Sequence, residues 1–239
     1  MYPAGRAVVL LAVCSTELAG RRLTIEGRRV QAIPYGRLAL LVAFVDQDTY
    51  AHDELERRRN DAAWLATEAR ILEHAVERMR TNGAIVPMRL LTAFPHADAL
   101  EEAARESYAR WSRTLTRLGG KRECALHLYT GPHAPPAGEP YLMRISGRAS
   151  RTGRAPAMKA APAVLGHAHS VWRACASVAT ATRRVQTGGR RGALWSAVML
   201  VPENGVATLA AALEASAEAG ALLGVTAYLE APRAPFTFV

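Results

Sequence analysis

The 239-residue sequence is poor in the residue types that mark metal sites, disulfide frameworks or membrane spans. Its three cysteines, Cys14, Cys124 and Cys175, stand far apart, and no pair has the spacing of metal ligands. Free cysteine is among the most buried residue types, so we expect three small core side chains. No run reaches the roughly 18 apolar residues that a membrane-spanning helix needs. The start of the chain also lacks the layout of a signal peptide, and the sequence therefore predicts a cytoplasmic protein.

Motifs that carry catalysis or bind nucleotides are also missing. The sequence contains no G-x-S-x-G, no P-loop and no G-x-G-x-x-G. His167 and His169 fall in a helical pattern, where two residues are separated by about 200° and cannot share a metal ion. His127 alternates with the apolar side chains of its predicted strand, and we expect it on the exposed side. We therefore expect no enzyme activity, no metal and no cofactor.

Acidic residues are absent between positions 144 and 191, where ten basic side chains occur, and the whole chain carries a formal net charge of +9. A segment of one sign favours acidic partners or polyanions, although a solvated basic loop has the same composition. Aromatic residues make up only 6% of the chain, and no strand has the motif on which RNA-binding sheets stack bases. We do not expect nucleic acid as the main partner, but a basic α+β polyanion- or nucleic-acid-binding protein is kept as the alternative.

What is present is the composition of a globular protein, with half of the residues hydrophobic and 21% charged. Apolar runs at 7–15 and 38–45 predict strands, and apolar residues three or four apart over 53–81 predict an amphipathic helix. An extended segment at 84–94 and a second helix up to residue 118 follow. These elements predict an N-terminal α+β domain over residues 1–122.

The remainder predicts a second α+β domain over residues 123–230. Proline and glycine crowd residues 131–140, and we expect a flexible insertion at about 131–160. Outside it, the elements follow the order β-α-β-β-α-β, which is the split βαβ or ferredoxin-like arrangement. Asn204 is the expected N-cap of the last helix and Gly220 its expected end. The fold class is therefore α+β with two domains, the C-terminal one ferredoxin-like with an inserted loop, followed by a tail at 231–239.

Two short sequence segments, which we call phrases, have residues that are unusual for their positions. Pro87 and Arg89 interrupt an extended segment that ends at Phe94, and a proline within a strand indicates an edge or a bulge. The C-terminal tail carries proline and aromatic residues, whereas chain ends are usually polar and frayed. Such a tail either packs on its own domain or docks on a partner, and we favour its own second domain. The candidate interaction residues are Pro87, Arg89, Phe94, Pro235, Phe236 and Phe238.

Together these phrases resemble the GvpL/GvpF family of gas-vesicle proteins. The matching motifs occur along the chain in the same order as in the family: Val86-Pro87-Met88-Arg89, Thr92-Ala93-Phe94, Gly120-Lys121-Arg122-Glu123, Tyr141-Leu142 and Ala231 to Val239. The chain departs from the family pattern where Phe-Gly is replaced by Leu90-Leu91, and where the tryptophan after the glutamate is replaced by Cys124.

The resemblance implies an accessory structural or assembly protein of gas vesicles, located in the cytoplasm at the vesicle. Its implied partners are the small hydrophobic shell protein and other accessory gas-vesicle proteins, with no membrane. A small-molecule-sensing or enzymatic α+β protein is a third hypothesis. The sequence does not separate an L-like from an F-like role, and it leaves the contact surface and the oligomeric state open.

Overall fold

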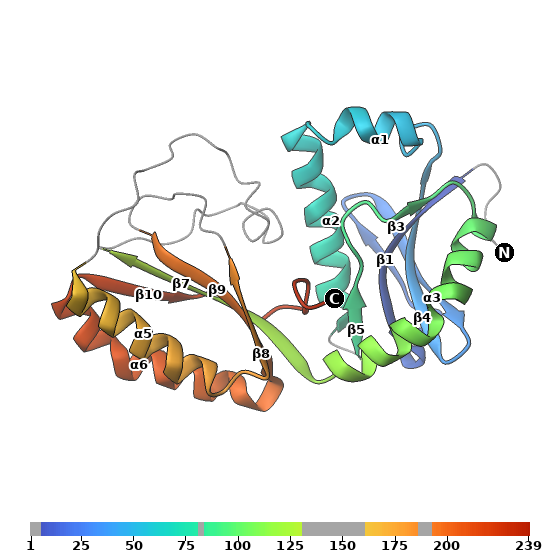
Figure 1. Ribbon diagram of the computed structural model, residues 1–239. Helices are drawn as coiled ribbons and strands as arrows, with labels where there is room; N and C mark the ends of the chain where they lie inside the picture. Colours follow the sequence, from blue (N-terminus) through green and yellow to red (C-terminus); the bar gives the residue numbers. More distant parts are fainter. Residues whose placement is uncertain (1–5, 81–83, 131–160, 186–192) are drawn as a thin grey trace. The chain divides into compact units, whose positions relative to one another are not determined.

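A computed structural model describes residues 6–80, 84–130, 161–185 and 193–239. The chain divides into two compact units, the first ending at Gly119 and the second spanning Gly120–Phe238, and Val239 is grouped with the first. Each unit contains its own sheet and its own helices (Figure 1). The predicted insertion at about 131–160 lies outside the described residues.

The first unit is built on a sheet with the strand order β2-β3-β4-β1-β5, and β6 pairs with β1 beside β5. All of the described pairings in this sheet are antiparallel. Its strands are β1 (Arg6–Ser15), β2 (Arg22–Ile25), β3 (Arg28–Tyr35), β4 (Leu38–Asp46), β5 (Ile85–Pro87) and β6 (Ala93–Phe94).

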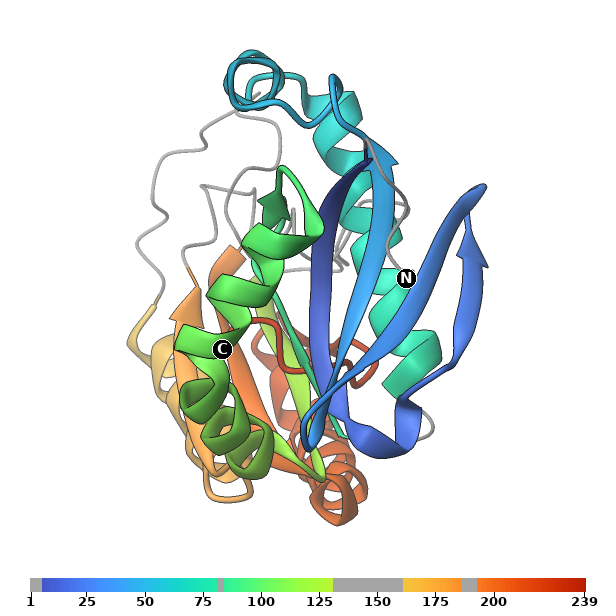
Figure 2. The same cartoon turned by 90° about the vertical axis from the view of Figure 1, so that its right-hand side faces the viewer.

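Helices cover both faces of this sheet, which explains why β1 and β4 are apolar almost throughout (Figure 2). α3 (Ala97–Leu118) packs on one face, where its Leu100, Ala104 and Trp111 join side chains of β1 and β4 in one core cluster. α2 (Ala62–Arg80) packs on the other face through a buried stripe that includes Leu72 and Val76.

The prediction of one continuous helix at 53–81 was wrong. A short helix, α1 (His52–Arg58), precedes α2, and the break lies at Asp61. The carboxylate Oδ1 of Asp61 accepts hydrogen bonds from the backbone N–H groups of Ala63 (3.0 Å) and Trp64 (3.0 Å). This N-cap satisfies donors that a new helix leaves unpaired, so the sequence restarts the helix there.

The second unit has the element order β7, α5, β8, β9, α6 and β10, and its four strands lie in the order β10-β7-β9-β8. Every pairing is antiparallel. The bounds are β7 (Lys121–Thr130), α5 (Pro162–Ala176), β8 (Ala181–Val185), β9 (Ala193–Pro202), α6 (Val206–Leu222) and β10 (Val225–Leu229).

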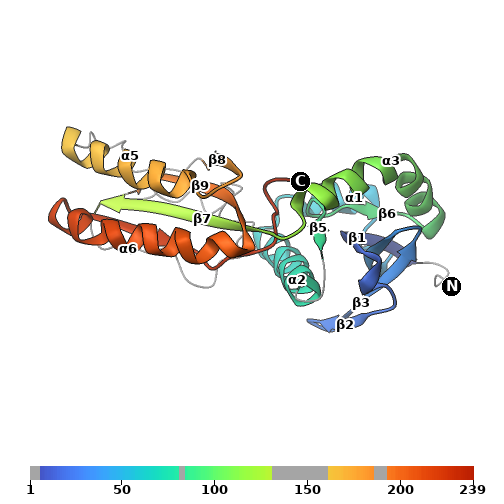
Figure 3. The same cartoon turned by 90° about the horizontal axis from the view of Figure 1, so that it is seen from below.

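The two helices that the structure describes in the second unit, α5 and α6, lie side by side on one face of this sheet (Figures 1 and 3). The core beneath them alternates along the strands, with Cys124, Leu126 and Leu128 of β7 facing the helices. Trp172 of α5 meets Trp195 of β9 edge to face, with ring centroids 5.2 Å apart. The helix-facing side of the sheet is therefore an ordinary apolar core.

Two boundaries of α6 differ from the sequence prediction. Asn204 lies within a short 3₁₀ turn (Glu203–Gly205) and is not the N-cap of α6. Gly220 lies inside the helix and is buried, and a Cβ there would stand 2.9 Å from the carbonyl oxygen of Val225. A close approach of β10 to the helix therefore requires this glycine, and the chain turns only at Gly224, whose φ is +67°.

Candidate interaction surfaces

The segment that contains Pro87 and Arg89 makes two separate pairings with β1. The N–H of Met88 donates to the carbonyl of Leu11 (2.8 Å), and the N–H of Leu10 donates to the carbonyl of Thr92 (2.9 Å). Between these bonds the chain turns sharply, and Leu91 adopts a left-handed φ of +65°. The proline thus stands in a strand at the sheet edge, the position that a residue without an N–H tolerates.

The three candidates in this segment have different surroundings. Pro87 is buried opposite Ala12 of β1, and Phe94 is half-buried against the α3 core cluster. Arg89 is exposed, and its carbonyl accepts a hydrogen bond from the hydroxyl of Thr92 at 2.8 Å. Only Arg89 of the three therefore presents its side chain to the solvent.

The C-terminal tail is fastened to the sheet of its own unit by Glu123, which is fully buried. The two carboxylate oxygens of Glu123 accept hydrogen bonds from the N–H and the hydroxyl of Thr237, both at 2.6 Å. The backbones of Glu123 and Arg233 exchange two further bonds of 2.9 Å, and Arg183 of β8 donates to the carbonyl of Thr237. A charged acceptor makes such bonds shorter and stronger than neutral ones.

The aromatic side chains of the tail pack against the sheet face that the helices leave uncovered. Phe236 and Phe238 are half-buried against a small cluster of Ala125 and Val198, and Pro235 is buried. Phe236 and Phe238 are therefore brought together on one surface, by strands that are far from them in sequence.

His127 is a correction to the sequence prediction, because it is 5% exposed and not on an open face. Its Nδ1 lies 2.7 Å from the hydroxyl of Ser196 on β9, and its Nε2 lies 2.9 Å from Oε1 of Glu230 after β10. The alternation of β7 correctly places His127 on the sheet face opposite the helices, but this face is also covered, by the C-terminal tail and by Glu230. Ser196 and Glu230 are equally buried, so the trio cross-links three strands within the protein interior.

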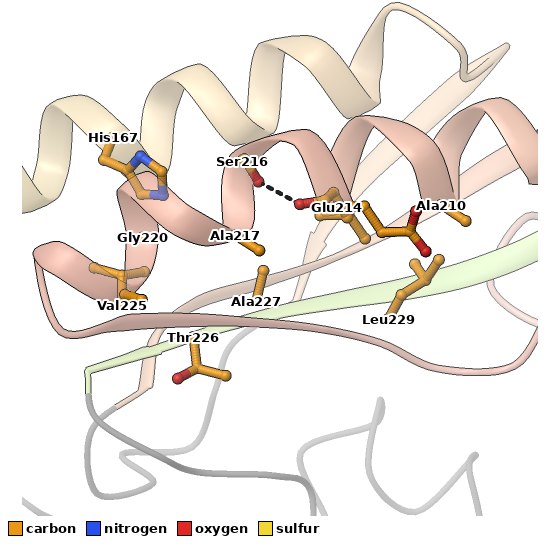
Figure 4. A pocket seen from close by; sticks show the side chains of 12 residues that line it. His167, Ala210, Glu214, Ser216, Ala217, Gly220, Val225, Thr226, Ala227 and Leu229 are labelled. Carbon is orange, nitrogen blue, oxygen red and sulfur yellow. Dashed lines mark hydrogen bonds between the residues drawn. The ribbon is translucent and has the colours of Figure 1, made fainter.

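A hollow of about 450 Å³ lies between α6 and the edge strand β10, with His167 of α5 at one end (Figure 4). Its lining is mostly small and apolar, and Ala217 and Ala227 face each other across it in Figure 4. Beyond the hollow, Leu222 at the end of α6 is 86% exposed. Large apolar side chains left in solvent next to a concave apolar surface are typical of a binding site for another protein.

The edge of β10 adds hydrogen-bonding groups to this hollow. The N–H of Glu230 donates to Ala125 of β7, and alternate residues of an antiparallel strand point their backbone groups the same way. Ala227 and Leu229 therefore direct their N–H and C=O groups away from β7, along the hollow that they line. We name this surface, formed by α6, the β10 edge and Leu222, the α6–β10 groove.

Sequence reasoning missed the α6–β10 groove. The apolar stripe of α6 indicated a buried face, and two of its members, Leu213 and Ala217, line the groove, but nothing in the sequence indicated that this face leaves a hollow beside β10. Seven of the ten basic side chains of the segment at 144–191 lie outside the described residues, and the other three, Arg173, Arg183 and Arg184, are exposed. No group of three or more histidine, cysteine or acidic residues in the described ranges could hold a metal ion.

Burial raises the pKa of Cys14 to about 12, and it raises the pKa values of Cys124 and Cys175 to about 11. These thiols stay protonated and unreactive at neutral pH, as expected for core cysteines. Among the helices that the structure describes, none is long and apolar enough to cross a membrane.

Comparison with known proteins finds a family whose sequence pattern extends over nearly the whole chain. The sequence model of the gas vesicle synthesis protein GvpL/GvpF family matches residues 8–239. The chain belongs to the GvpL/GvpF family. Gas vesicle protein L of Streptomyces sp. (strain CB03234) is 26% identical over 173 residues, which cover 66% of this chain. The match spans 64% of the length of that curated relative.

Two solved structures share the fold. The crystal structure of GvpF from Anabaena sp. PCC7120 superimposes with a TM-score of 0.68 and 12% identity, covering 98% of both chains. GvpF from Microcystis aeruginosa gives a TM-score of 0.65 and 12% identity, covering 97% of this chain and 98% of that one. At this identity the likeness concerns the mixed helix-and-sheet fold.

Within each unit, described segments that match the family are in contact. Glu123 ends the phrase that begins at Gly120, and it binds Thr237 of the terminal phrase. The two halves of the earlier phrase, around Pro87 and Phe94, both pair with β1. The resemblance to the family pattern implies a glycine at the position of Leu91, the residue with a left-handed backbone. A glycine there meets a conformational need that leucine meets only with strain.

Proposed function

We propose that this protein is an accessory protein of gas vesicles that acts in vesicle assembly, in the cytoplasm, by binding the shell protein and other gas-vesicle proteins. Family membership supports the link to gas vesicles. The α6–β10 groove is the observation that supports binding of a protein segment, because it combines an apolar hollow with backbone groups that point outward at the edge of the described sheet. Such an edge accepts an additional strand or packs an apolar helix.

The second unit is best interpreted as a ferredoxin-like domain that carries this surface. Its element order, strand order and common helix face support that interpretation. The tail occupies part of the opposite face of the sheet, whereas the groove is an accessible, mostly apolar surface of this domain. A hydrophobic shell protein, whose apolar surfaces need cover before assembly, has the chemistry to fill it.

Under this proposal, five of the six candidate residues stabilise the fold and one is available to contact a partner. Pro235, Phe236 and Phe238 hold the tail on its own sheet, and Pro87 and Phe94 complete the first unit. Arg89 is exposed and is the member of the set available for a partner.

Co-purification from cells that carry the vesicle genes tests the proposal. The tagged protein should recover shell or accessory gas-vesicle proteins, and Ala217→Arg should abolish recovery because it places a long cation in the groove. Ala211→Arg is the matched control, since Ala211 is exposed on the same helix but does not line the groove.

If the unmodified chain recovers no gas-vesicle protein, the proposal is contradicted. Equal recovery by Ala217→Arg and Ala211→Arg would show that the groove is not the contact surface. Circular dichroism of both variants verifies that α6 is intact before the comparison is made.

A further inference from the structure

The first unit contains a second hollow, of about 920 Å³, beside the edge strand β2. The exposed arginines Arg6, Arg22 and Arg29 line it, together with Thr24 and Gln31. These residues share one face of the sheet, because Arg22 pairs with Gln31 and Thr24 pairs with Arg29 across the β2–β3 hairpin. Figure 3 shows β2 at the outer edge beside β3.

The side chains of the three arginines have no partner in the part of the chain that the structure describes. Among residues 6–80, 84–130, 161–185 and 193–239, none of the three guanidinium groups has an ion-pair or hydrogen-bond partner. Asp46 stands opposite Arg6 in the sheet, but its Oδ1 accepts the backbone N–H groups of Asp48 (3.0 Å) and Thr49 (3.1 Å).

The other nearby charges are likewise engaged elsewhere. Both terminal nitrogens of Arg28 donate hydrogen bonds to the carboxylate of Glu68 on α2. Oε1 of Glu26, in the hairpin turn, lies 3.5 Å from Nε of Arg70. Like charges gathered around one hollow, none of them directly paired with a carboxylate among the described residues, produce a positive potential there. The hollow therefore attracts an anionic group from outside the chain.

The edge of β2 also offers a backbone ladder. The two-residue turn at Glu26 and Gly27, both with positive φ, makes Ile25 and Arg28 a hydrogen-bonded pair. The N–H of Ala32 donates to the carbonyl of Arg21, which fixes the same alternation at the other end. Arg22 and Thr24 lie between these pairs, so their N–H and C=O groups point outward along the free edge.

We propose that the β2 edge and the arginine hollow bind an extended acidic segment of a partner protein, which joins the sheet as a further strand. In a strand, every second side chain faces the same side. A segment with acidic residues at alternate positions would place them over Arg22 and Arg29 while its backbone pairs with Thr24. This occupant uses both features of the site, whereas a nucleic acid would use the charges alone.

A purified-protein binding assay tests this inference without any gas-vesicle protein, so its result is independent of the proposed function. The probe is a short fluorescent peptide in which glutamates alternate with valines and threonines, measured by anisotropy at low salt. Arg22→Gln with Arg29→Gln should weaken binding at least tenfold, because both cations are lost. Thr24→Pro should weaken it similarly, since it removes an outward N–H that the hairpin does not use.

The matched control is Arg105→Gln with Arg113→Gln, two exposed arginines of α3 that remove the same charge. It should bind the peptide as the unmodified protein does. A short oligothymidine provides the comparison with nucleic acid. Should Thr24→Pro fail to fold, the two double variants still decide the outcome.

Three results would overturn the inference. They are no binding of the peptide to the unmodified protein, equal weakening by the α3 control, and oligothymidine binding of equal strength that Thr24→Pro leaves unchanged. The last result would assign the hollow to polyanions.

Discussion

The two sheets of this protein are covered in different ways. In the first unit, α2 and α3 pack on opposite faces, and the central strands are apolar on both sides. In the second unit, α5 and α6 share one face, and in the described part of the other face the C-terminal tail and a buried polar trio lie on the strands. The first sheet thus depends on apolar packing, and the second depends in addition on buried hydrogen bonds.

In the second unit, the C-terminal tail is part of the fold because its Thr237 satisfies the buried carboxylate of Glu123. Buried polar groups are costly unless each is satisfied, so Glu123 and His127 require Thr237, Ser196 and Glu230 to be in place. The second unit should consequently be more sensitive than the first to loss of a single polar side chain. Cys14 lies in one core, and Cys124 and Cys175 lie in the other, so thiol labelling reports on each unit separately.

Glu123→Ala gives the largest expected effect. It removes a buried carboxylate that accepts two bonds of 2.6 Å, and the loss should lower the free energy of unfolding of the second unit by about 2–4 kcal/mol. Alkylation of Cys124 and Cys175 in dilute denaturant should accelerate while that of Cys14 stays unchanged. Glu203→Ala is the control, because Glu203 pairs with Arg122 at an exposed position. Equal effects of the two changes would contradict the role given to the tail.

Glu68→Ala is the corresponding change in the first unit. The carboxylate of Glu68 is buried and holds Arg28 through two bonds of 2.6 and 2.8 Å, so its loss should cost about 2–3 kcal/mol. Labelling of Cys14 should accelerate, and labelling of Cys124 and Cys175 should not. Glu54→Ala removes ion pairs with Arg57 and Arg58 on the surface of α1 and should leave all three rates unchanged. Accelerated labelling of all three thiols would show that the units open together.

Alkaline pH should destabilise the second unit more than the first through its thiols. Burial raises the pKa values of Cys124 and Cys175 to about 11, so the unfolded chain ionises first and stability falls as the pH rises above about 9. Each thiol should contribute a loss of about 1.4 kcal/mol per pH unit in this range. Denaturant unfolding between pH 8 and 10 measures the loss, and Cys175→Ala should remove about half of it in the second unit. A pH-independent midpoint would contradict this account.

Leu91→Gly gives the smallest effect and has the opposite sign. Relief of a left-handed leucine should outweigh the extra entropy of glycine in the unfolded chain and stabilise the first unit by about 0.5–1 kcal/mol. Leu90→Gly, one position earlier and without positive φ, should instead destabilise it. The midpoints of urea unfolding distinguish the two, and destabilisation by both would mean that the Leu91 side chain outweighs its backbone strain.

Periodicity along the chain was enough to predict the α+β class and the order of elements in the second half. It could not predict how surfaces are covered. Alternation placed His127 opposite the helices, but nothing local indicated that Ser196 and Glu230, 69 and 103 residues away, would enclose it. The contact of Glu123 with Thr237 joins positions separated by 114 residues, and only the resemblance of both phrases to one family hinted at it.

The arginine hollow was missed for a similar reason. Arg22 and Arg29 are ordinary surface residues in the sequence, and the absence of a partner becomes visible only when the hairpin brings them to one face. The break at Asp61 did carry a local signal, because aspartate two and three residues before the N–H groups it accepts is a helix N-cap. The apolar stripe that continues across it concealed that signal.

Restoration of gas vesicles in cells that lack the gene for this protein tests the central claim most directly. The unmodified chain and Ala211→Arg should restore vesicles, and Ala217→Arg, produced at the same level, should not. Intact vesicles in cells without the gene, or full restoration by Ala217→Arg, would contradict the assignment of vesicle assembly to the α6–β10 groove.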